Sequence, residues 1–77
     1  MSKYIVDDLE ALIGVLPLHI QTPLRERDNL EDLLEVVMDL GRPPEARFLG
    51  TEAVLTSQEI TEQDIQHVVE RIGGFGD

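Results

Sequence analysis

The sequence predicts a small α+β protein, with helices at both ends of the chain and a three-stranded antiparallel sheet between them. Three observations predict this class. Apolar residues recur at helical spacing near the N-terminus, a capping signature opens an apolar stripe near the C-terminus, and two adjacent prolines divide the middle of the chain into short extended runs. The 77 residues, 42% of them hydrophobic, suffice for one core. We therefore expect a single domain over residues 1–77.

The first predicted element is a helix over residues 4–16. Its acidic residues fall early, where they complement the positive end of a helix, and Pro17 cannot continue the helix without losing a backbone hydrogen bond. The apolar stripe consists of Ile5, Leu9, Leu12, Ile13 and Leu16.

A short second helix is predicted to begin at Pro17, because the missing N–H of proline costs nothing at the first helical position. Pro23 is expected to stop or kink this helix after about a turn and a half, and a polar loop follows over residues 25–28. The residues expected to point inward are Leu18, Ile20 and Leu24.

The stretch 29–41 fits both a helical face and a period-two strand face. Asn29 is a candidate helix cap. Our interpretation divides the stretch into one helical turn through about Leu33 and a strand over residues 34–40. The following Pro43 and Pro44 donate no backbone hydrogen bonds, so they belong in the connection between two strands.

Two further strands are predicted at residues 45–49 and 52–56, joined by a tight hairpin in which Gly50 supplies a positive φ. Together with the strand at 34–40 they make the three-stranded sheet. We place Ala46, Phe48 and Val54 on its core side, and we place Arg47 and Glu52 on its outer side.

A capped helix is predicted over residues 62–72. Thr61 caps it and Asp64 occupies the capping-box position, with Ile60 and Ile65 placed to form a hydrophobic staple. Gly73 and Gly74 are the stop signal, and residues 74–77 are expected to begin a linker. The buried stripe is predicted to be Ile65, Val68, Val69 and Ile72.

The charge balance limits the possible partners. Sixteen acidic and six basic residues give a formal net charge of −10, which repels phosphate backbones and anionic lipids. The acidic surface either binds a basic protein partner or merely keeps the domain in solution. The chain has no cysteine, no apolar run long enough to span a membrane and no signal-peptide pattern. We expect no direct nucleic-acid binding, no membrane insertion and a cytoplasmic location.

The sequence gives little indication of catalysis or metal binding. His19 and His67 are far apart, and the pair Asp64 and His67, three residues apart on the last helix, is a weak metal half-site against the simpler interpretation of an exposed histidine. No serine lies in a nucleophile elbow, and no P-loop is present. We predict no catalytic, cofactor-binding or metal-binding residue in this chain, and no enzymatic activity.

Three residues around the proline pair are the candidate interaction site. Arg42, Pro43 and Arg47 flank one turn of a strongly acidic chain, where the arginines would pair with carboxylates of a partner. The alternative is that they pair within the chain, for example with Glu45. A proline-recognition ligand is disfavoured, because such ligands carry several prolines at PxxP spacing and this chain has one adjacent pair.

Taken in order, four features resemble a known family: Leu16 and Pro17, the turn of residues 41–44, the Gly50 hairpin, and the capped helix from Thr61 to Gly73. This pattern resembles the N-terminal domain of the stage III sporulation protein AA-like ATPases, including their cyanobacterial and plastid members, which are similar to the motor ATPases of secretion and pilus systems. Pro23 departs from the pattern by interrupting the second helix of the family.

The resemblance implies a non-catalytic assembly or partner-docking domain, excised from a larger secretion-type AAA+ ATPase. Its partners would be the nucleotide-binding domain of the same or a neighbouring subunit and a further protein, in a homo-oligomer. ATP and magnesium would bind the absent domain, since the family's P-loop lies beyond residue 77, and the compartment would be the cytoplasm or the plastid stroma. The alternative function is a free-standing acidic adaptor that binds a basic protein, and an autonomous small enzyme is the weakest reading.

Overall fold

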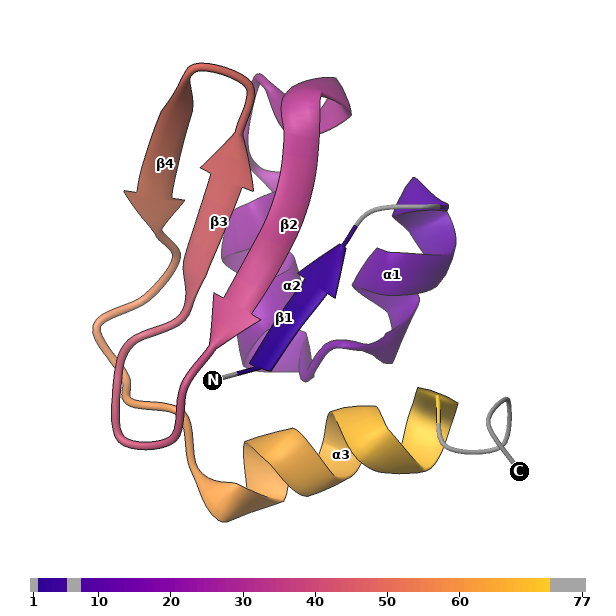
Figure 1. The fold of residues 1–77 in the computed structure, drawn as a ribbon, viewed down its shortest axis with the longest axis vertical. Coiled ribbons are helices and arrows are strands. Elements are labelled where there is room, and N and C mark those ends of the chain that lie inside the picture. Colours follow the sequence, from indigo (N-terminus) through magenta and orange to yellow (C-terminus); the bar gives the residue numbers. More distant parts are fainter. Residues whose placement is uncertain (1, 6–7, 73–77) are drawn as a thin grey trace.

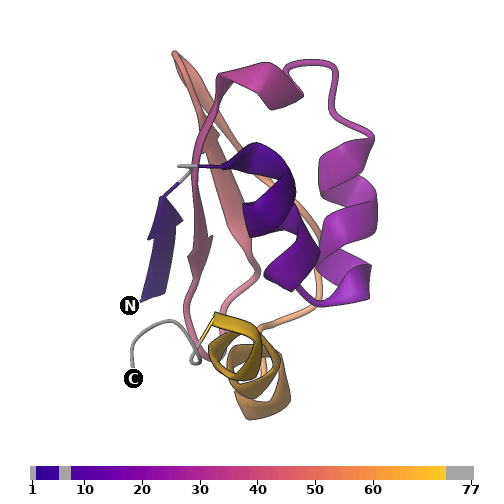
Figure 2. The same cartoon turned by 90° about the vertical axis from the view of Figure 1, so that its right-hand side faces the viewer.

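The protein is a two-layer α+β domain, which confirms the predicted class. The computed structural model describes residues 2–5 and 8–72. A four-stranded sheet forms one layer, helices α1 and α2 form the other, and α3 crosses one end of both (Figures 1 and 2). In chain order the elements are β1 (Ser2–Ile5), α1 (Leu9–Val15), α2 (Leu18–Arg25), a 3₁₀ turn (Leu30–Asp32), β2 (Leu33–Met38), β3 (Glu45–Phe48), β4 (Thr51–Val54) and α3 (Glu62–Ile72).

The sheet is antiparallel throughout, in the order β1-β2-β3-β4. The three predicted strands are present, and a fourth, β1, pairs with β2 through Tyr4 opposite Val36 and Ile5 opposite Glu35. Residues 4 and 5 were expected to open the first helix. That helix begins instead at Leu9, because the side chain of Asp8 caps it by accepting a hydrogen bond from the amide of Ala11 at 3.3 Å.

Helix α2 is longer than predicted. It runs to Arg25 with Pro23 inside it, and Pro17 caps it by accepting hydrogen bonds through its carbonyl from the amides of Ile20 and Gln21. Pro23 has no backbone N–H to donate to the carbonyl four residues before it, and the helix ends two residues later at Arg25. Leu18 is 73% exposed and does not point inward, whereas the other two predicted inward residues are fully buried.

Strand β2 begins with a β-bulge. Leu33 lies opposite Phe48, and Glu35 lies opposite the next residue of β3, Arg47, so Leu34 is an extra residue without a partner. Leu33 is buried and Leu34 is 50% exposed. The bulge therefore turns one leucine of the pair toward solvent at the start of the strand.

The prolines lie in the connection between β2 and β3, as predicted. A β-turn closes there when the amide of Arg42 donates to the carbonyl of Asp39, with Gly41 at the third position and a φ of 81°. The amide of Gly41 donates to the carbonyl of Ile60, and the amide of Ile60 donates to the carbonyl of Arg42, both at 2.8 Å. The connection is thus bound to the segment that leads into α3.

The β3–β4 hairpin closes around Leu49 and Gly50, and the predicted positive φ of Gly50 is confirmed at 83°. One residue of the predicted core side was wrong. Val54 is 59% exposed, because it has the same parity along β4 as Glu52 and therefore shares its outer face. Ala53 takes the inner position, opposite Ala46.

We call the side of the sheet away from α1 and α2 the open face, since no helix of the described chain covers it (Figure 2). It follows from the strand registers and the alternation of side chains. From β2, β3 and β4 it carries Glu35, Val37, Glu45, Arg47, Glu52 and Val54, of which Val37 is buried.

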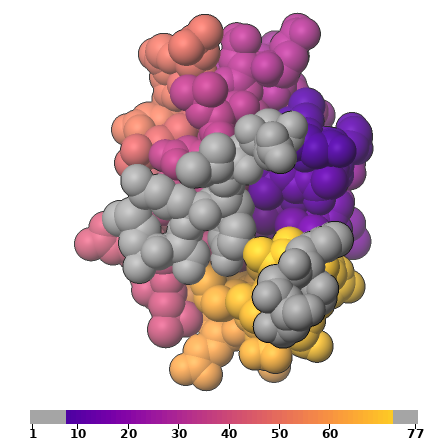
Figure 3. Space-filling model, turned by 45° about the vertical axis from the view of Figure 1, so that its right-hand side comes forward, coloured from indigo at the N-terminus to yellow at the C-terminus, as the bar shows by residue number. Residues whose placement is uncertain are grey.

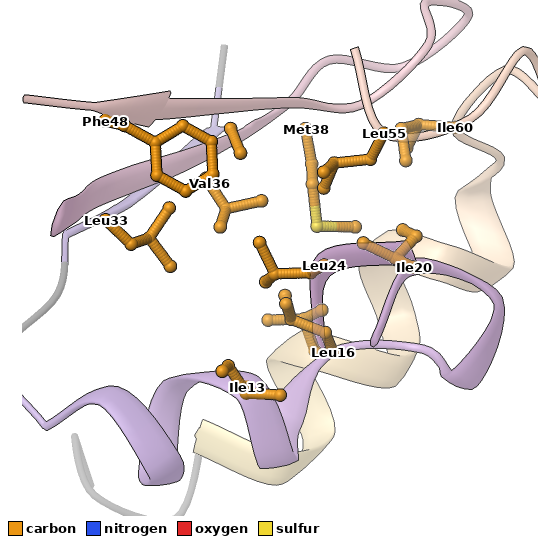
Figure 4. Close-up of a cluster of buried hydrophobic side chains, with 12 residues drawn as sticks. Ile13, Leu16, Ile20, Leu24, Leu33, Val36, Met38, Phe48, Leu55 and Ile60 are labelled. Atoms are coloured by element: carbon orange, nitrogen blue, oxygen red, sulfur yellow. The ribbon is translucent and has the colours of Figure 1, made fainter. Parts of the chain in front are cut away.

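The hydrophobic core fills the space between the inner face of the sheet and the helices (Figure 4). Burial of a leucine or isoleucine side chain stabilises the fold by about 1.5–3 kcal/mol relative to leaving it exposed. The helices contribute Ile13, Leu16, Ile20, Leu24 and Val68, the sheet contributes Leu33, Val36, Met38, Ala46 and Phe48, and the connection before α3 contributes Leu55 and Ile60.

Helix α3 forms one end of the molecular surface, next to α1 (Figure 3). Its predicted capping box is confirmed: the amide of Asp64 donates to the hydroxyl of Thr61 at 3.2 Å, and the amide of Thr61 donates to the carboxylate of Asp64 at 2.9 Å. Of the predicted buried stripe, Val68 is fully buried and Val69 is 48% exposed. The predicted stop at residues 73 and 74 and the predicted linker at 74–77 lie outside the described residues.

The capping box predicts that Thr61→Ala lowers the free energy of unfolding by about 1 kcal/mol, because the amide of Asp64 loses its acceptor. Thr61→Ser retains the hydroxyl and is the control. Chemical denaturation of both variants measures the difference. An equal loss in the two variants would show that the hydroxyl is not the cause.

The β2–β3 turn predicts that Gly41→Ala lowers the free energy of unfolding by about 1–2 kcal/mol, because the left-handed backbone conformation at φ 81° is unfavourable for alanine. No other atom lies within 4 Å of the position that the new methyl would take, so the cost comes from the backbone alone. Gly14→Ala, at an exposed position inside α1, is the matched control and raises stability by about 0.5–1 kcal/mol. Thermal melting that moves both variants in the same direction would contradict this account.

Candidate functional site

The structure separates the three residues of the predicted interaction site. Arg42 and Pro43 are exposed in the β2–β3 connection, whereas Pro44 is buried. Arg47 lies in the middle of β3 on the open face, with 42% of its side chain exposed. Binding of a partner by Arg42, Pro43 and Arg47 stays a prediction, and the three residues do not form one continuous cluster in chain order or along the sheet.

Arg47 is paired within the chain. Its Nη1 lies 3.2 Å from a carboxylate oxygen of Glu35, and its Nε lies 3.6 Å from a carboxylate oxygen of Glu52. These residues lie directly opposite Arg47 on the two neighbouring strands. The intramolecular alternative named Glu45 as the partner, but the register of the sheet brings Glu35 and Glu52 to Arg47.

Asp64 is a buried carboxylate, with a residue exposure of 8%. Besides its capping bond to Thr61, it lies 3.3 Å from Nε2 of His19 on α2. The weak metal half-site had paired Asp64 with His67, but the imidazole that the structure brings to the carboxylate is that of His19. In the described part of the chain no three histidine, cysteine, aspartate or glutamate residues gather where they could hold a metal ion.

A shallow hollow beside the N-terminus of α3 brings together Ser57, His19 and Asp64. These are the residue types of a hydrolase triad. In a triad the serine hydroxyl bonds to the histidine, and no such hydrogen bond joins Ser57 to His19 among the described residues. The hollow therefore lacks the proton-transfer contact that a serine nucleophile requires.

We define the acidic corner as Glu26, Asp28, Glu31 and Asp32, at the end of the molecule where α2 passes into β2 (Figure 1). All four are exposed, and none of them forms an ion pair with another described residue. Arg27, the base within this segment, lies over the ring of Phe48 with its guanidinium carbon 5.4 Å from the ring centroid.

Two exposed leucines border the acidic corner. The amide of Leu49 at the hairpin tip donates to the carbonyl of Asp32 at 3.0 Å, and Leu34 follows two residues after Asp32. Leu49 is 71% exposed and Leu34 is 50% exposed. Figure 3 shows the hairpin tip and the 26–32 segment together at the same end of the surface. Carboxylates and apolar side chains therefore meet on one surface.

The sequence analysis did not identify this surface. The segment had been divided between a polar loop and a first helical turn, so its acids were not considered as a group. Four acids within the seven residues 26–32 are the signal that could have found them. The exposure of Leu34 could not have been found in this way, because it depends on the bulge opposite Phe48.

A second depression lies on the open face beside the hairpin. Leu34 and Thr51 line it together with the charged cluster of Glu35, Arg47 and Glu52. It is open to solvent and encloses no buried nucleophile or base.

No family model and no solved structure matches the chain. Two curated proteins do. The chain is 46% identical over 71 residues to "Uncharacterized protein ycf45" of Porphyra purpurea, and 40% identical over 70 residues to "Protein SEEDLING PLASTID DEVELOPMENT 1" of Arabidopsis thaliana. These matches cover 92% and 91% of the chain, but only 13% and 10% of the two relatives.

These comparisons correct the family resemblance. The matched proteins are named as an uncharacterised protein and as a plastid development protein, and neither name is that of a sporulation, secretion or AAA+ ATPase. The assignment to an ATPase N-terminal domain was therefore wrong, as were the ATPase keywords that followed from it. The pattern of a proline turn, a hairpin and a capped helix predicts the fold, but it does not identify a motor ATPase.

The predicted location agrees with the comparisons in its plastid part, through the name of the Arabidopsis protein. None of the described helices has the length and apolar character to cross a membrane. Over nine-tenths of its own length, the chain is similar to a segment of these two longer proteins, and it spans about a tenth of each.

Proposed function

We propose that this chain is an acidic docking domain that binds a basic segment of a protein partner and performs no catalysis itself. The observation that carries the proposal is the acidic corner, whose four carboxylates are exposed beside Leu34 and Leu49 and form no ion pair with another described residue. A partner segment with lysine or arginine next to an apolar side chain would complement both parts of this surface.

The distribution of arginines supports the proposal. Arg25 pairs with Glu10 at 3.4 Å, and Arg47 is held between Glu35 and Glu52. These bases pair with acids outside the acidic corner, where Arg27 is the one base among four acids, in a chain whose formal net charge is −10. A patch with a net charge of one sign raises the association rate of a partner of opposite sign and selects against partners of the same sign.

The same charge supports a protein partner over a nucleic acid or an anionic membrane, whose phosphates the acids would repel. We propose no cofactor for this segment and no enzymatic activity, in keeping with the shallow hollows and with the lack of a serine–histidine hydrogen bond among the described residues. Docking onto a nucleotide-binding domain and homo-oligomer formation were expected from the ATPase resemblance, and they lose their basis with it. A plastid setting is supported by the name of the Arabidopsis relative.

Charge neutralisation tests the proposal. The corner variant carries Glu26→Gln, Asp28→Asn and Glu31→Gln, and the matched control carries Glu59→Gln, Glu62→Gln and Glu70→Gln, which remove the same charge from other exposed positions. The probe is an acetylated and amidated deca-lysine peptide, titrated by calorimetry at about 50 mM and about 300 mM salt, since higher salt screens the attraction.

We expect the corner variant to weaken binding by about fivefold or more and the control by less than about twofold, because a local patch attracts more strongly than charge spread over the surface. Equal weakening in the two variants would show that the acids act only as a solvated surface. Absence of binding to the unmodified chain at low salt would also contradict the proposal.

A further inference from the structure

Strand β4 is the last strand of the sheet, and nothing in the described part of the chain pairs with its outer edge (Figure 1). An uncovered edge presents backbone N–H and C=O groups to which another strand can bind. The question is which groups of β4 face outward and what kind of strand they fit.

The hydrogen bonds between β3 and β4 show which backbone groups of β4 face outward. The amide of Leu55 donates to the carbonyl of Pro44 at 2.9 Å, so the backbone groups of Leu55 face β3. In an antiparallel ladder the facing groups alternate, which directs those of Ala53 and Thr51 toward β3 as well. The N–H and C=O groups of Glu52 and Val54 therefore point away from the sheet, and they offer four hydrogen bonds to an added strand.

The side chains at these two positions define the partner. Glu52 and Val54 both lie on the open face, where Val54 is 59% exposed and the Glu52 carboxylate is 62% exposed. Residues of an added strand that lie directly opposite them would project onto the same face. An apolar residue fits best opposite Val54, and a basic residue fits best opposite Glu52. In a strand antiparallel to β4, the basic residue comes two positions after the apolar one.

Charge complementarity favours the basic choice. The open face near β4 carries the carboxylates of Glu35, Glu45 and Glu52 against the guanidinium of Arg47. A lysine or arginine of the added strand beside Glu52 would be a second base next to these three carboxylates. It would reduce the net negative charge of the open face. An acidic residue there would face an unfavourable like-charge pair.

A second copy of this chain fits the edge poorly. Antiparallel pairing of β4 with itself would place each Glu52 beside Val54 of the other copy and bring two Glu52 carboxylates onto one face. Each copy also carries a formal net charge of −10. Repulsion between like charges opposes such a dimer.

We infer that β4 is a strand-addition site, which binds an extended segment of a basic protein partner with the pattern apolar-x-basic. This inference rests on the proposed docking function and specifies how the partner binds. The backbone groups of Glu52 and Val54 supply the hydrogen bonds, and their side chains select the apolar and the basic residue.

Amide hydrogen exchange followed by NMR tests the inference on the 77-residue chain. The probe is an acetylated and amidated peptide, Thr-Val-Thr-Lys-Thr-Val-Thr-Lys, and the control peptide has glutamate in place of lysine. In the free protein we expect fast exchange at Glu52 and Val54 and slow exchange at Ala53 and Leu55. Addition of the lysine peptide should slow exchange at Glu52 and Val54 by about tenfold, because their amides gain acceptors.

Two variants separate backbone from side chain. Val54→Pro removes an outward N–H that the β3–β4 ladder does not use, and it should weaken binding of the lysine peptide by about tenfold, whereas Val54→Thr retains the N–H and should weaken it by less than about twofold. Glu52→Lys retains the backbone and should reverse the preference between the lysine and glutamate peptides. This reversal tests the inference even if the proline variant does not fold.

The outcomes distinguish the inference from the proposed function. Binding of deca-lysine without any binding of the lysine peptide, or with unchanged exchange at Glu52 and Val54, would overturn strand addition and leave the acidic docking function standing. Slow exchange at both amides in the free protein would show that the edge is already occupied and would also overturn it. Failure of both peptides to bind would overturn the proposed function as well.

Discussion

The structure depends on the backbone hydrogen bonds that join the β2–β3 connection to Ile60. Pro43 and Pro44 donate none, so the amide of Gly41 and the carbonyl of Arg42 provide the link. The link fixes Ile60, which is 2% exposed, in the core and sets the point from which α3 starts. Because α3 closes the end of both layers, one short loop holds the sheet, the core and the last helix together.

This arrangement leaves the functional surfaces on the other parts of the molecule. The helices cover one face of the sheet and α3 covers one end, and none of these helices lies over the β4 edge or the acidic corner. Arg47 joins three strands through its two carboxylate partners and stiffens the open face. The exposed edge strand and the nearby acidic segment are the features on which the proposed recognition of a chain segment rests.

Features that depend on neighbouring residues could be predicted from the sequence, and features that depend on distant strands could not. The capping box of Thr61 and Asp64 spans four residues, and the positive φ of Gly50 could be predicted from its residue type within a tight turn. By contrast, Ile5 also fits a helical stripe, and only the pairing of residues 2–5 with β2 makes them a strand. Periodicity within one segment carries no information about such pairing.

The candidate site shows the same limit. The outward direction of Arg47 follows from alternation along its own strand and was predicted correctly. Its partners were not, since Glu35 becomes its neighbour only through the register of β2 and the bulge before it. The contact between His19 and Asp64 likewise joins two helices 45 residues apart in sequence, the difference between positions 64 and 19, and no local pattern signals it.

The bulge at Leu34 has a consequence for how the domain can diverge. Leu33 and Glu35 already face opposite sides of the sheet, so loss of the single residue between them would restore regular pairing with β3 and leave the inside-outside pattern of the strand intact. Such a shortened chain would keep its core and lose one of the two exposed leucines beside its carboxylates. Insertion or deletion of a residue at position 34 can thus change the surface beside the acidic corner without changing the core.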